Sequence, residues 1–307
     1  LAAPKSAPAR ELIITKENKI LISASVDGSI SLWSFPEKKH LQRMEKAHSG
    51  EPKIALTEDE NYLFSASVDK NIKIWDMKEK KCVYAFSQAH DHGIREVCID
   101  GSSKIVVSGA NDKLIKVWDP LEKKLISSWP ENLSKFVLLK NGKHLVAFNE
   151  SEKKLQIWDI TQKKCVDTLA SVDYFVMSMV LASNQKTLVC GSSDYSIRIW
   201  DLDQKKCVQT ISGEHSNHVS AIEFLNDEKQ IITASKDNII VWDFPDMKQV
   251  WKIGQNFINR GIKAIGKDSF ISLSEDNKMI IWDINAKKEI YQFDKNDTGD
   301  VKTFEVS

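Results

Sequence analysis

The pentapeptide Ile72-Lys73-Ile74-Trp75-Asp76 decides the fold, because versions of it recur along the 307 residues at nearly constant spacing. The repeated tryptophans are separated by 40 to 43 residues, and they are Trp33, Trp75, Trp118, Trp158, Trp200, Trp242 and Trp282. Asp follows six of them, and Ser34 follows the first. A fixed period of this length indicates a repeat architecture in which each repeat is one small structural unit.

Each unit is predicted to form four short β-strands, which we label a to d in chain order. Residues before the tryptophans alternate β-branched and polar side chains, as in Ile115-Lys116-Val117, and such alternation is typical of half-buried strands. A four-stranded unit cannot bury both faces of its sheet alone, so neighbouring units must stack into a ring. We place strand a near residues 11–14, 53–57, 94–99, 135–139, 175–181, 219–224 and 262–265.

This pattern resembles the WD-repeat (Trp-Asp repeat) β-propeller family over about residues 11–293. The resemblance implies an all-β fold, a seven-bladed β-propeller whose four-stranded antiparallel blades surround a central channel. Residues 1–10 are expected to be a linker or junction, residues 11–299 the propeller, and residues 300–307 an extra strand. Because 301–306 alternates like another strand a, we expect it either to begin an interrupted eighth unit or to displace 11–14 and close the ring.

The resemblance also implies a hydrogen-bonded set within each blade: a His before strand a, a Ser or Thr on strand b, an Asp in the b–c turn and the Trp on strand c. Only three units have a suitably spaced His and Asp, and Glu152 replaces the Asp in the fourth unit. The third set is expected to be incomplete, because Ala110 stands at the Ser position. The assigned residues are His48, Ser67, Asp69 and Trp75; His90, Asp112 and Trp118; and His215, Ser235, Asp237 and Trp242.

We interpret these His–Asp pairs as structural rather than catalytic. Three similar pairs around a ring cannot form one active site, whereas a buried His–Asp hydrogen bond satisfies polar groups that are costly to leave unpaired. We therefore expect His48 and His215 to be buried and within hydrogen-bonding reach of Asp69 and Asp237.

No catalytic, cofactor or metal site emerges from the sequence. It contains no Gly-rich phosphate loop, no His-Glu-x-x-His and no Gly-x-Ser-x-Gly. The nearest approach to a metal cluster is His90-Asp91-His92, in which His90 is already assigned to Asp112. Five cysteines, an odd number without a Cys-x-x-Cys pair, favour a reducing compartment, and we expect a cytoplasmic protein.

Charge is balanced overall but unevenly placed. Lys+Arg and Asp+Glu both number 43, so net charge gives no reason to expect nucleic acid as a partner. The longest uncharged run, 12 residues, is too short to span a bilayer. The c–d turns, however, hold 14 lysines against five acids, whereas the d–a and b–c loops carry acids. The lysines either solvate tight turns and blunt sheet edges or form a basic face that attracts acidic partners.

We call the end of the ring with the d–a and b–c loops the top, and the end with the a–b and c–d turns the bottom. Interfaces usually need aromatic or Arg anchors. Such residues, with neighbouring amides, occur in the predicted top loops and are candidate partner contacts: Arg95, Phe148, Asn149, Tyr174, Phe175, Phe257, Asn259 and Arg260. Trp129 and Trp251 fall on predicted outer strands, where they either mark a lateral surface or cover the neighbouring blade.

The resulting prediction is a non-catalytic scaffold, a monomeric propeller that recruits protein or peptide partners into a larger complex through its loops. One alternative is that the chain is the recruiting domain of a larger enzyme of the kinase or ubiquitin-ligase type. Another is a propeller enzyme with its chemistry at the channel mouth, which would need a convergent acid–base or metal constellation that the sequence does not display.

Overall fold

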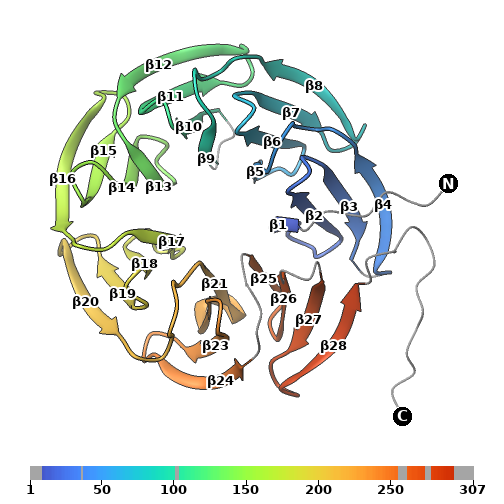
Figure 1. Ribbon diagram of the computed structural model, residues 1–307, viewed down its shortest axis with the longest axis vertical. Helices are drawn as coiled ribbons and strands as arrows, with labels where there is room; N and C mark the ends of the chain where they lie inside the picture. The colour runs from blue at the N-terminus through green and yellow to red at the C-terminus, as the bar shows by residue number, and fades with distance from the viewer. Residues whose placement is uncertain (1–8, 36, 101–103, 255–260, 274–277, 294–307) are drawn as a thin grey trace.

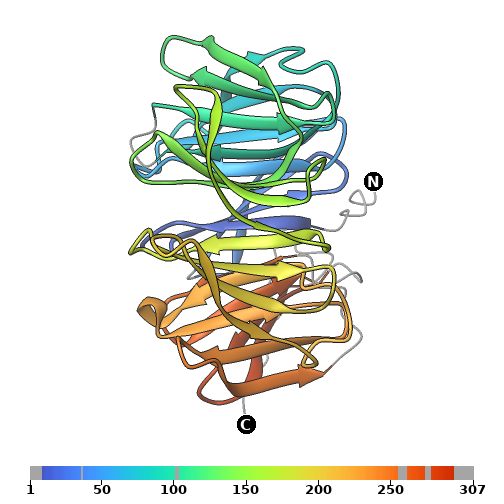
Figure 2. The same cartoon turned by 90° about the vertical axis from the view of Figure 1, so that its left-hand side faces the viewer.

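The computed structural model describes residues 9–35, 37–100, 104–254, 261–273 and 278–293. These residues form seven four-stranded antiparallel sheets, arranged as the blades of a propeller (Figure 1). Seen from the side, the blades make a thick disc across which the strands run (Figure 2). The all-β, seven-bladed prediction is confirmed, and each repeated Trp lies on the third strand of its blade.

The four strands of each blade are consecutive in the chain, and the first is innermost. Blades one to three contain β1 (Ala9–Ile14), β2 (Ile20–Ser25), β3 (Ile30–Ser34) and β4 (Lys39–Met44); β5 (Pro52–Leu56), β6 (Tyr62–Ser67), β7 (Ile72–Asp76) and β8 (Lys81–Phe86); β9 (Ile94–Ile99), β10 (Val106–Ala110), β11 (Leu114–Asp119) and β12 (Lys124–Pro130). Blades four and five contain β13 (Leu133–Leu138), β14 (His144–Asn149), β15 (Lys154–Asp159) and β16 (Lys164–Ser171); β17 (Val176–Leu181), β18 (Thr187–Ser192), β19 (Ile197–Asp201) and β20 (Lys206–Ile211). Blades six and seven contain β21 (Ala221–Leu225), β22 (Gln230–Ala234), β23 (Asn238–Asp243) and β24 (Lys248–Gly254); β25 (Ile262–Ile265), β26 (Ser269–Leu273), β27 (Met279–Asp283) and β28 (Lys288–Phe293).

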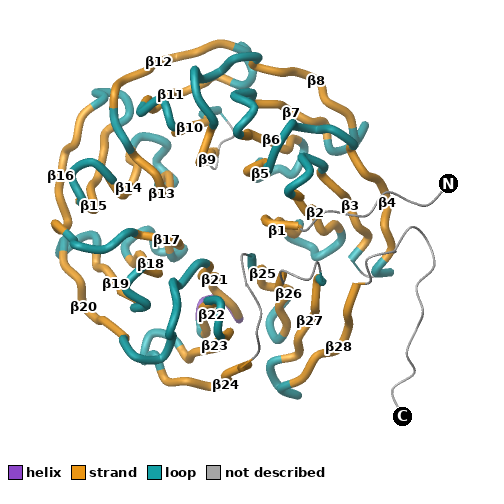
Figure 3. The backbone as a smooth tube through the Cα atoms, in the orientation of Figure 1, coloured by secondary structure: helices purple, strands orange, loops and turns teal. Residues whose placement is uncertain are grey.

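The core lies between the blades rather than within them. Apolar side chains of one sheet pack against those of the next, as where Ile232 and Val241 of blade six meet Phe270 and Trp282 of blade seven. The second strand of each blade is buried on both faces and therefore carries nearly continuous small and apolar side chains. Loops gather at the two ends of the disc, and η1 (Asn226–Glu228) is a single 3₁₀ turn between strands (Figure 3).

Blades one and seven close the ring through side-chain packing. Leu12 and Leu21 of blade one share an apolar cluster with Ile271 and Phe293 of blade seven, and the Phe293 ring lies 5.6 Å from Trp33. The innermost position in blade one is held by β1, which pairs with β2 and starts two residues before the predicted propeller boundary. The predicted strand at 301–306 lies outside the described residues and stays a prediction.

The Asp of the repeated Trp-Asp pair stabilises the c–d turn that follows it. The Asp76 carboxylate accepts the backbone N–H groups of Lys78 and Glu79 at 2.9 and 2.8 Å. Asp119 accepts those of Leu121 and Glu122 in the same way. The short hairpin thus closes with its N–H groups satisfied, which explains why Asp follows Trp in this repeat.

Trp129 and Trp251 cover the neighbouring blade, one of the two predicted alternatives. Trp129 on β12 is buried in a cluster with Leu133 and Phe136 of blade four. Trp251 on β24 lies 6.0 Å from the ring of Trp282 in blade seven. Both side chains therefore contribute to the contact between successive blades.

Candidate functional site

Blade two contains a chain of four side chains joined by hydrogen bonds. The indole N–H of Trp75 donates to Ser65 Oγ at 2.8 Å, and Ser65 Oγ lies 2.7 Å from His48 Nε2. His48 Nδ1 lies 2.9 Å from the Asp69 carboxylate. Burial would raise the pKa of Asp69, but the hydrogen bond and charge of His48 outweigh it and lower that pKa to about 2.

The prediction that Ser67 belongs to this set is wrong, because Ser65 occupies the position. Side chains alternate along a strand, so Ser65 and Ser67 lie on the same face of β6 and sequence spacing alone did not separate them. Ser67 Oγ instead donates to the backbone carbonyls of Gly50 and Glu51.

Blade three has a complete set, contrary to the prediction based on Ala110. Ser108, two residues earlier on β10, accepts the Trp118 indole N–H at 2.9 Å and lies 2.7 Å from His90 Nε2. His90 Nδ1 lies 2.9 Å from Asp112. The hydroxyl residue stands ten positions before the Trp here and in blade two, which is the signal that identifies it.

In blade six the predicted direct contact between His215 and Asp237 is wrong. His215 Nδ1 lies 2.9 Å from Ser235 Oγ, and Ser235 in turn donates to Asp237. His215 Nε2 lies 2.8 Å from Thr233 Oγ1, which also accepts the Trp242 indole N–H. The b–c turn is one residue shorter in this blade. Asp237 therefore contacts Ser235 instead of the His215 imidazole, and Ser235 lies between the two. Burial lowers the pKa of His215 to about 4.

Blades four and five hold their tryptophans differently. In blade four Trp158 donates to the side chain of Gln156 at 3.2 Å, and Gln156 donates to Glu152. In blade five Cys190 occupies the hydroxyl position, and the buried indole N–H of Trp200 has no hydrogen-bond partner among the described residues. Sequence reasoning missed Gln156, although a polar residue two positions before Trp was a visible signal.

The Ser–His–Asp connectivity in blades two and three resembles a catalytic triad, but the setting does not support catalysis. Ser65 and Ser108 are fully buried, and a Trp N–H already donates to each hydroxyl oxygen. A nucleophile must reach its substrate, and neither oxygen is accessible. Burial also raises the pKa of the Cys98 and Cys190 thiols well above its usual range, which disfavours the nucleophilic thiolate.

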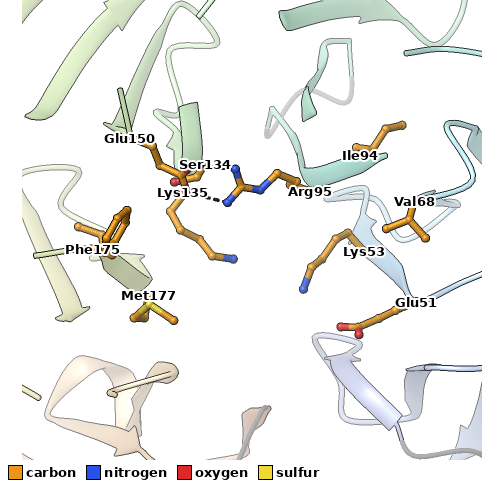
Figure 4. A pocket seen from close by; sticks show the side chains of 11 residues that line it. Glu51, Lys53, Val68, Ile94, Arg95, Ser134, Lys135, Glu150, Phe175 and Met177 are labelled. Atoms are coloured by element: carbon orange, nitrogen blue, oxygen red, sulfur yellow. Dashed lines mark hydrogen bonds and ion pairs between the residues drawn. The ribbon is translucent and has the colours of Figure 1, made fainter. Parts of the chain in front are cut away.

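The surface includes a depression of about 400 Å³ at the top of the channel, which we call the top depression (Figure 4). It combines apolar and charged side chains from blades two to five: Glu51, Lys53, Val68, Ile94, Arg95, Ser134, Lys135, Glu150, Phe175, Val176 and Met177. Val68 and Phe175 are 55% and 45% exposed, so the apolar part of the lining is available to solvent. A concave surface with exposed apolar groups and placed charges suits a peptide or protein contact.

Two ion pairs fix the charged groups of the top depression. Arg95 on β9 binds Glu150 through two hydrogen bonds of 2.9 and 2.6 Å, which join blade three to blade four. Pairing with Arg95 lowers the pKa of Glu150. Deeper in the channel Lys135 lies 2.6 Å from Glu96. These contacts hold the lining in place.

The structure separates the predicted contact residues into three groups. Arg95 and Phe175 line the top depression. Phe148, Asn149 and Tyr174 are buried and have structural contacts instead. Phe257, Asn259 and Arg260 lie outside the described residues.

The contacts of the buried group explain why these residues offer no surface to a partner. Phe148 packs beneath Phe175 with ring centroids 6.0 Å apart, and Asn149 donates to Glu131 at 3.0 Å. The guanidinium of Arg198 lies 3.7 Å from the centre of the Tyr174 ring. These residues therefore support the loops, whereas Val68, Lys53, Lys135 and Met177, which sequence reasoning missed, line the surface.

Channel-facing residues of the first four blades carry alternating charge: Glu11, Lys53, Glu96 and Lys135. The Glu11 carboxylate accepts the backbone N–H of Ile54 at 3.0 Å. Burial in the channel raises the pKa of Glu11, although the nearby charge of Lys53 opposes the effect. The alternation places unlike charges next to each other and stabilises the inner wall.

Several bottom lysines make contacts between blades. Lys38 Nζ lies 4.2 Å from the ring centre of Tyr291, and Lys123 Nζ lies 5.1 Å from that of Tyr84. Lys205 pairs with Asp167 of the preceding blade. These contacts support the structural interpretation of those lysines, while an acidic partner at the bottom face stays a prediction.

The described residues were also compared with the requirements of a metal site and of a membrane span, and they meet neither. They contain no group of three His, Cys, Asp or Glu side chains placed to hold a metal ion. Among these residues, none of the helices has the length and apolar character that a membrane span requires.

A family model described as WD domain, G-beta repeat matches residues 40–76, 80–119, 163–201 and 205–243, which together cover half of the chain. Each match runs from strand d of one blade through strand c of the next. A search of curated proteins returned no match.

Proposed function

The chain belongs to the WD domain, G-beta repeat family, and on that premise we propose that it is a non-catalytic scaffold that binds a protein or peptide at the top depression. WD-repeat propellers commonly serve as protein-interaction scaffolds. The observation that supports this site is the exposed apolar pair Val68 and Phe175, placed on either side of the Arg95–Glu150 ion pair.

The lining favours a partner segment that inserts an apolar side chain and makes hydrogen bonds around it. Phe175 and Met177 provide apolar contact on one side, and Glu51 and Lys53 provide polar contact on the other (Figure 4). Aromatic side chains of this kind supply large contact area at low conformational cost. The scaffold would thus anchor a partner through one short segment.

We further propose that the protein works in the cytoplasm. All five cysteines are free, which supports a reducing compartment.

Quantitative affinity capture tests the proposed site. Wild-type protein and a Val68→Ser/Phe175→Ser variant are used as baits in lysate of the source cells, and captured proteins are compared by mass spectrometry. A matched control, Val166→Ser, removes an exposed aliphatic side chain from the outer wall.

The proposal requires partners that are lost from the double variant and kept by Val166→Ser. Equal capture by all three baits, with circular dichroism showing that they are folded, would place the binding site elsewhere.

A further inference from the structure

At one register position of the channel wall, charged side chains come from only four of the seven blades. In each blade one innermost residue lies across from the strand-b residue that is level with the position three before the repeated Trp. Around the ring these innermost residues are Glu11, Lys53, Glu96, Lys135, Ser178, Ala221 and Gly261. The first four are charged, whereas the last three have small side chains or none. At this position the wall is therefore charged along blades one to four and leaves room along blades five to seven.

The room beside the small residues is a cavity of about 320 Å³, which we call the channel cavity and which the innermost segments of all seven blades line. A volume near 300 Å³ is at the lower end of the range for ligand pockets, so the channel cavity suits a small molecule. It adjoins the top depression, because Lys53, Lys135 and Met177 line both (Figure 4). Glu223 and Lys263, two residues further along blades six and seven, also line it and form their own ion pair.

The four charged groups on blades one to four lie close enough to act on one another. Lys135 Nζ lies 2.6 Å from the Glu96 carboxylate, and the charges of Lys53, Glu96 and Lys135 all influence Glu11. Burial nevertheless raises the pKa of Glu11, so the lysines nearby do not fully compensate its carboxylate for the loss of water. A further cation beside Glu11 would therefore stabilise the ionised carboxylate.

A ligand that suits this wall carries both signs of charge. A simple cation would be repelled by the ammonium groups of Lys53 and Lys135, and a simple anion by the carboxylates of Glu11 and Glu96. A molecule with an ammonium group and a carboxylate close together meets an unlike charge at each end, because neighbouring blades present a carboxylate next to an ammonium group. Met177, whose flexible side chain adapts to different shapes, adds an apolar contact for the rest of the ligand.

We propose that the channel cavity binds a small zwitterion of the α-amino-acid class. The ammonium group of the ligand pairs with Glu11 and Glu96, and its carboxylate pairs with Lys53 and Lys135. Its side chain occupies the space beside Ser178. This site is separate from the proposed partner contact and does not depend on it, because the carboxylates that select the zwitterion line the channel cavity and not the top depression.

The standard L-α-amino acids provide the probes. Each is added to the full chain, binding is detected by saturation-transfer NMR, and the Kd of the tightest binder is measured by isothermal titration calorimetry. That amino acid is then compared with the amine that lacks its carboxylate and with the carboxylic acid that lacks its amino group. We expect both analogues to bind at least about tenfold more weakly, because each leaves one pair of channel charges without its counterpart.

Substitutions locate the binding. Glu11→Gln removes the charge but keeps an oxygen that can accept the backbone N–H of Ile54, so it should fold. We expect this variant to bind the amino acid about tenfold more weakly and the deaminated acid no more weakly than wild type does. Ala221→Leu fills the space without changing a charge and should also weaken binding. Glu122→Gln, the same chemical change on an exposed c–d turn, is the matched control and should bind as wild type does.

Several outcomes would overturn the proposal. One is that no amino acid binds in the millimolar range, and another is that the amine or the acid binds as tightly as the amino acid. Equal binding by wild type and Glu11→Gln would also overturn it, and this variant decides the question if Ala221→Leu does not fold. Loss of binding in Phe175→Ser but not in Glu11→Gln would place the ligand in the top depression instead.

Discussion

Blades two and three differ from blades four and five in how their top loops are held. In the first pair a buried His joins the d–a loop to strand b through Ser65 or Ser108, and to the b–c turn through Asp69 or Asp112. In the second pair the His is absent. The indole N–H of Trp158 donates to Gln156, while that of Trp200 has no acceptor within the part of the chain that the structure describes. Blades four and five nevertheless supply Glu150, Phe175 and Met177 to the top depression.

Within one repeat, the residues that stabilise a blade therefore differ from the residues that are available to recognise a partner. Residues that repeat from blade to blade fasten the loops, and residues that depart from the repeat are free to contact partners. Phe175, the most exposed aromatic side chain of the top depression, lies in a blade without the His. The functional surface is therefore expected where the repeat is least regular.

Removing the His of blade three should have the largest effect on stability. His90→Ala leaves the buried Asp112 and Ser108 without their shared partner and opens a cavity, so we expect the free energy of unfolding to fall by about 3 kcal/mol. Chemical denaturation measures this loss. His92→Ala is the matched control, because His92 lies two residues away and is exposed. An equal loss in the two variants would contradict the role given to the buried set.

Acid should destabilise the protein through the His residues that burial keeps neutral. The pKa of His215 is lowered from 6.5 to about 4 when the protein folds, so below pH 6.5 the unfolded chain takes up a proton that the folded chain does not. The free energy of unfolding should thus fall by about 2 kcal/mol between pH 6.5 and 4. Burial also lowers the pKa of His90, which adds to the slope.

One variant tests whether His215 causes this pH dependence of the free energy of unfolding. His215→Gln removes the titrating group, and urea denaturation between pH 4 and 7 should show a smaller dependence on pH than in wild type. The His90 contribution should persist. An unchanged slope in His215→Gln would show that other groups cause the loss in acid.

Adding a hydrogen-bond acceptor for the Trp200 indole N–H should stabilise blade five slightly. Cys190→Ser places a hydroxyl ten residues before Trp200, as in blades one and seven, where Ser23 and Ser272 accept the indole N–H. We expect the free energy of unfolding to rise by about 0.5 kcal/mol. Cys98→Ser is the control, because its new hydroxyl has no indole partner and should not raise the free energy of unfolding. A similar rise in this control would contradict the role given to the Trp200 acceptor.

Much of the fold, but less of the site, follows from the sequence. Seven Trp-centred units with four strands each were predictable because one pattern repeats at fixed spacing. The hydroxyl residues were misplaced by two positions, since Ser65 and Ser67 lie on one face of the same strand. In blade six the shorter b–c turn places Ser235 between His215 and Asp237, and spacing alone could not show this.

The top depression was harder to predict, because it depends on how blades face each other. Arg95 and Phe175 were identified from their residue types, but Phe148 and Asn149 have equally suitable types and are buried. Val68 lies in the b–c turn of blade two and Lys53 on β5, and they meet residues of blades four and five only across the ring. Sequence reasoning locates strands within a blade better than it locates contacts across the channel.

The most direct test of the account measures stability and partner capture together for His48→Ala and Phe175→Ser, at a temperature where both variants are folded. We expect His48→Ala to unfold at a lower temperature and still capture the partners of the wild-type protein. Phe175→Ser should lose less than about 1 kcal/mol of stability and fail to capture them. The opposite result, with His48→Ala fully stable but unable to bind and Phe175→Ser binding normally, would contradict the account.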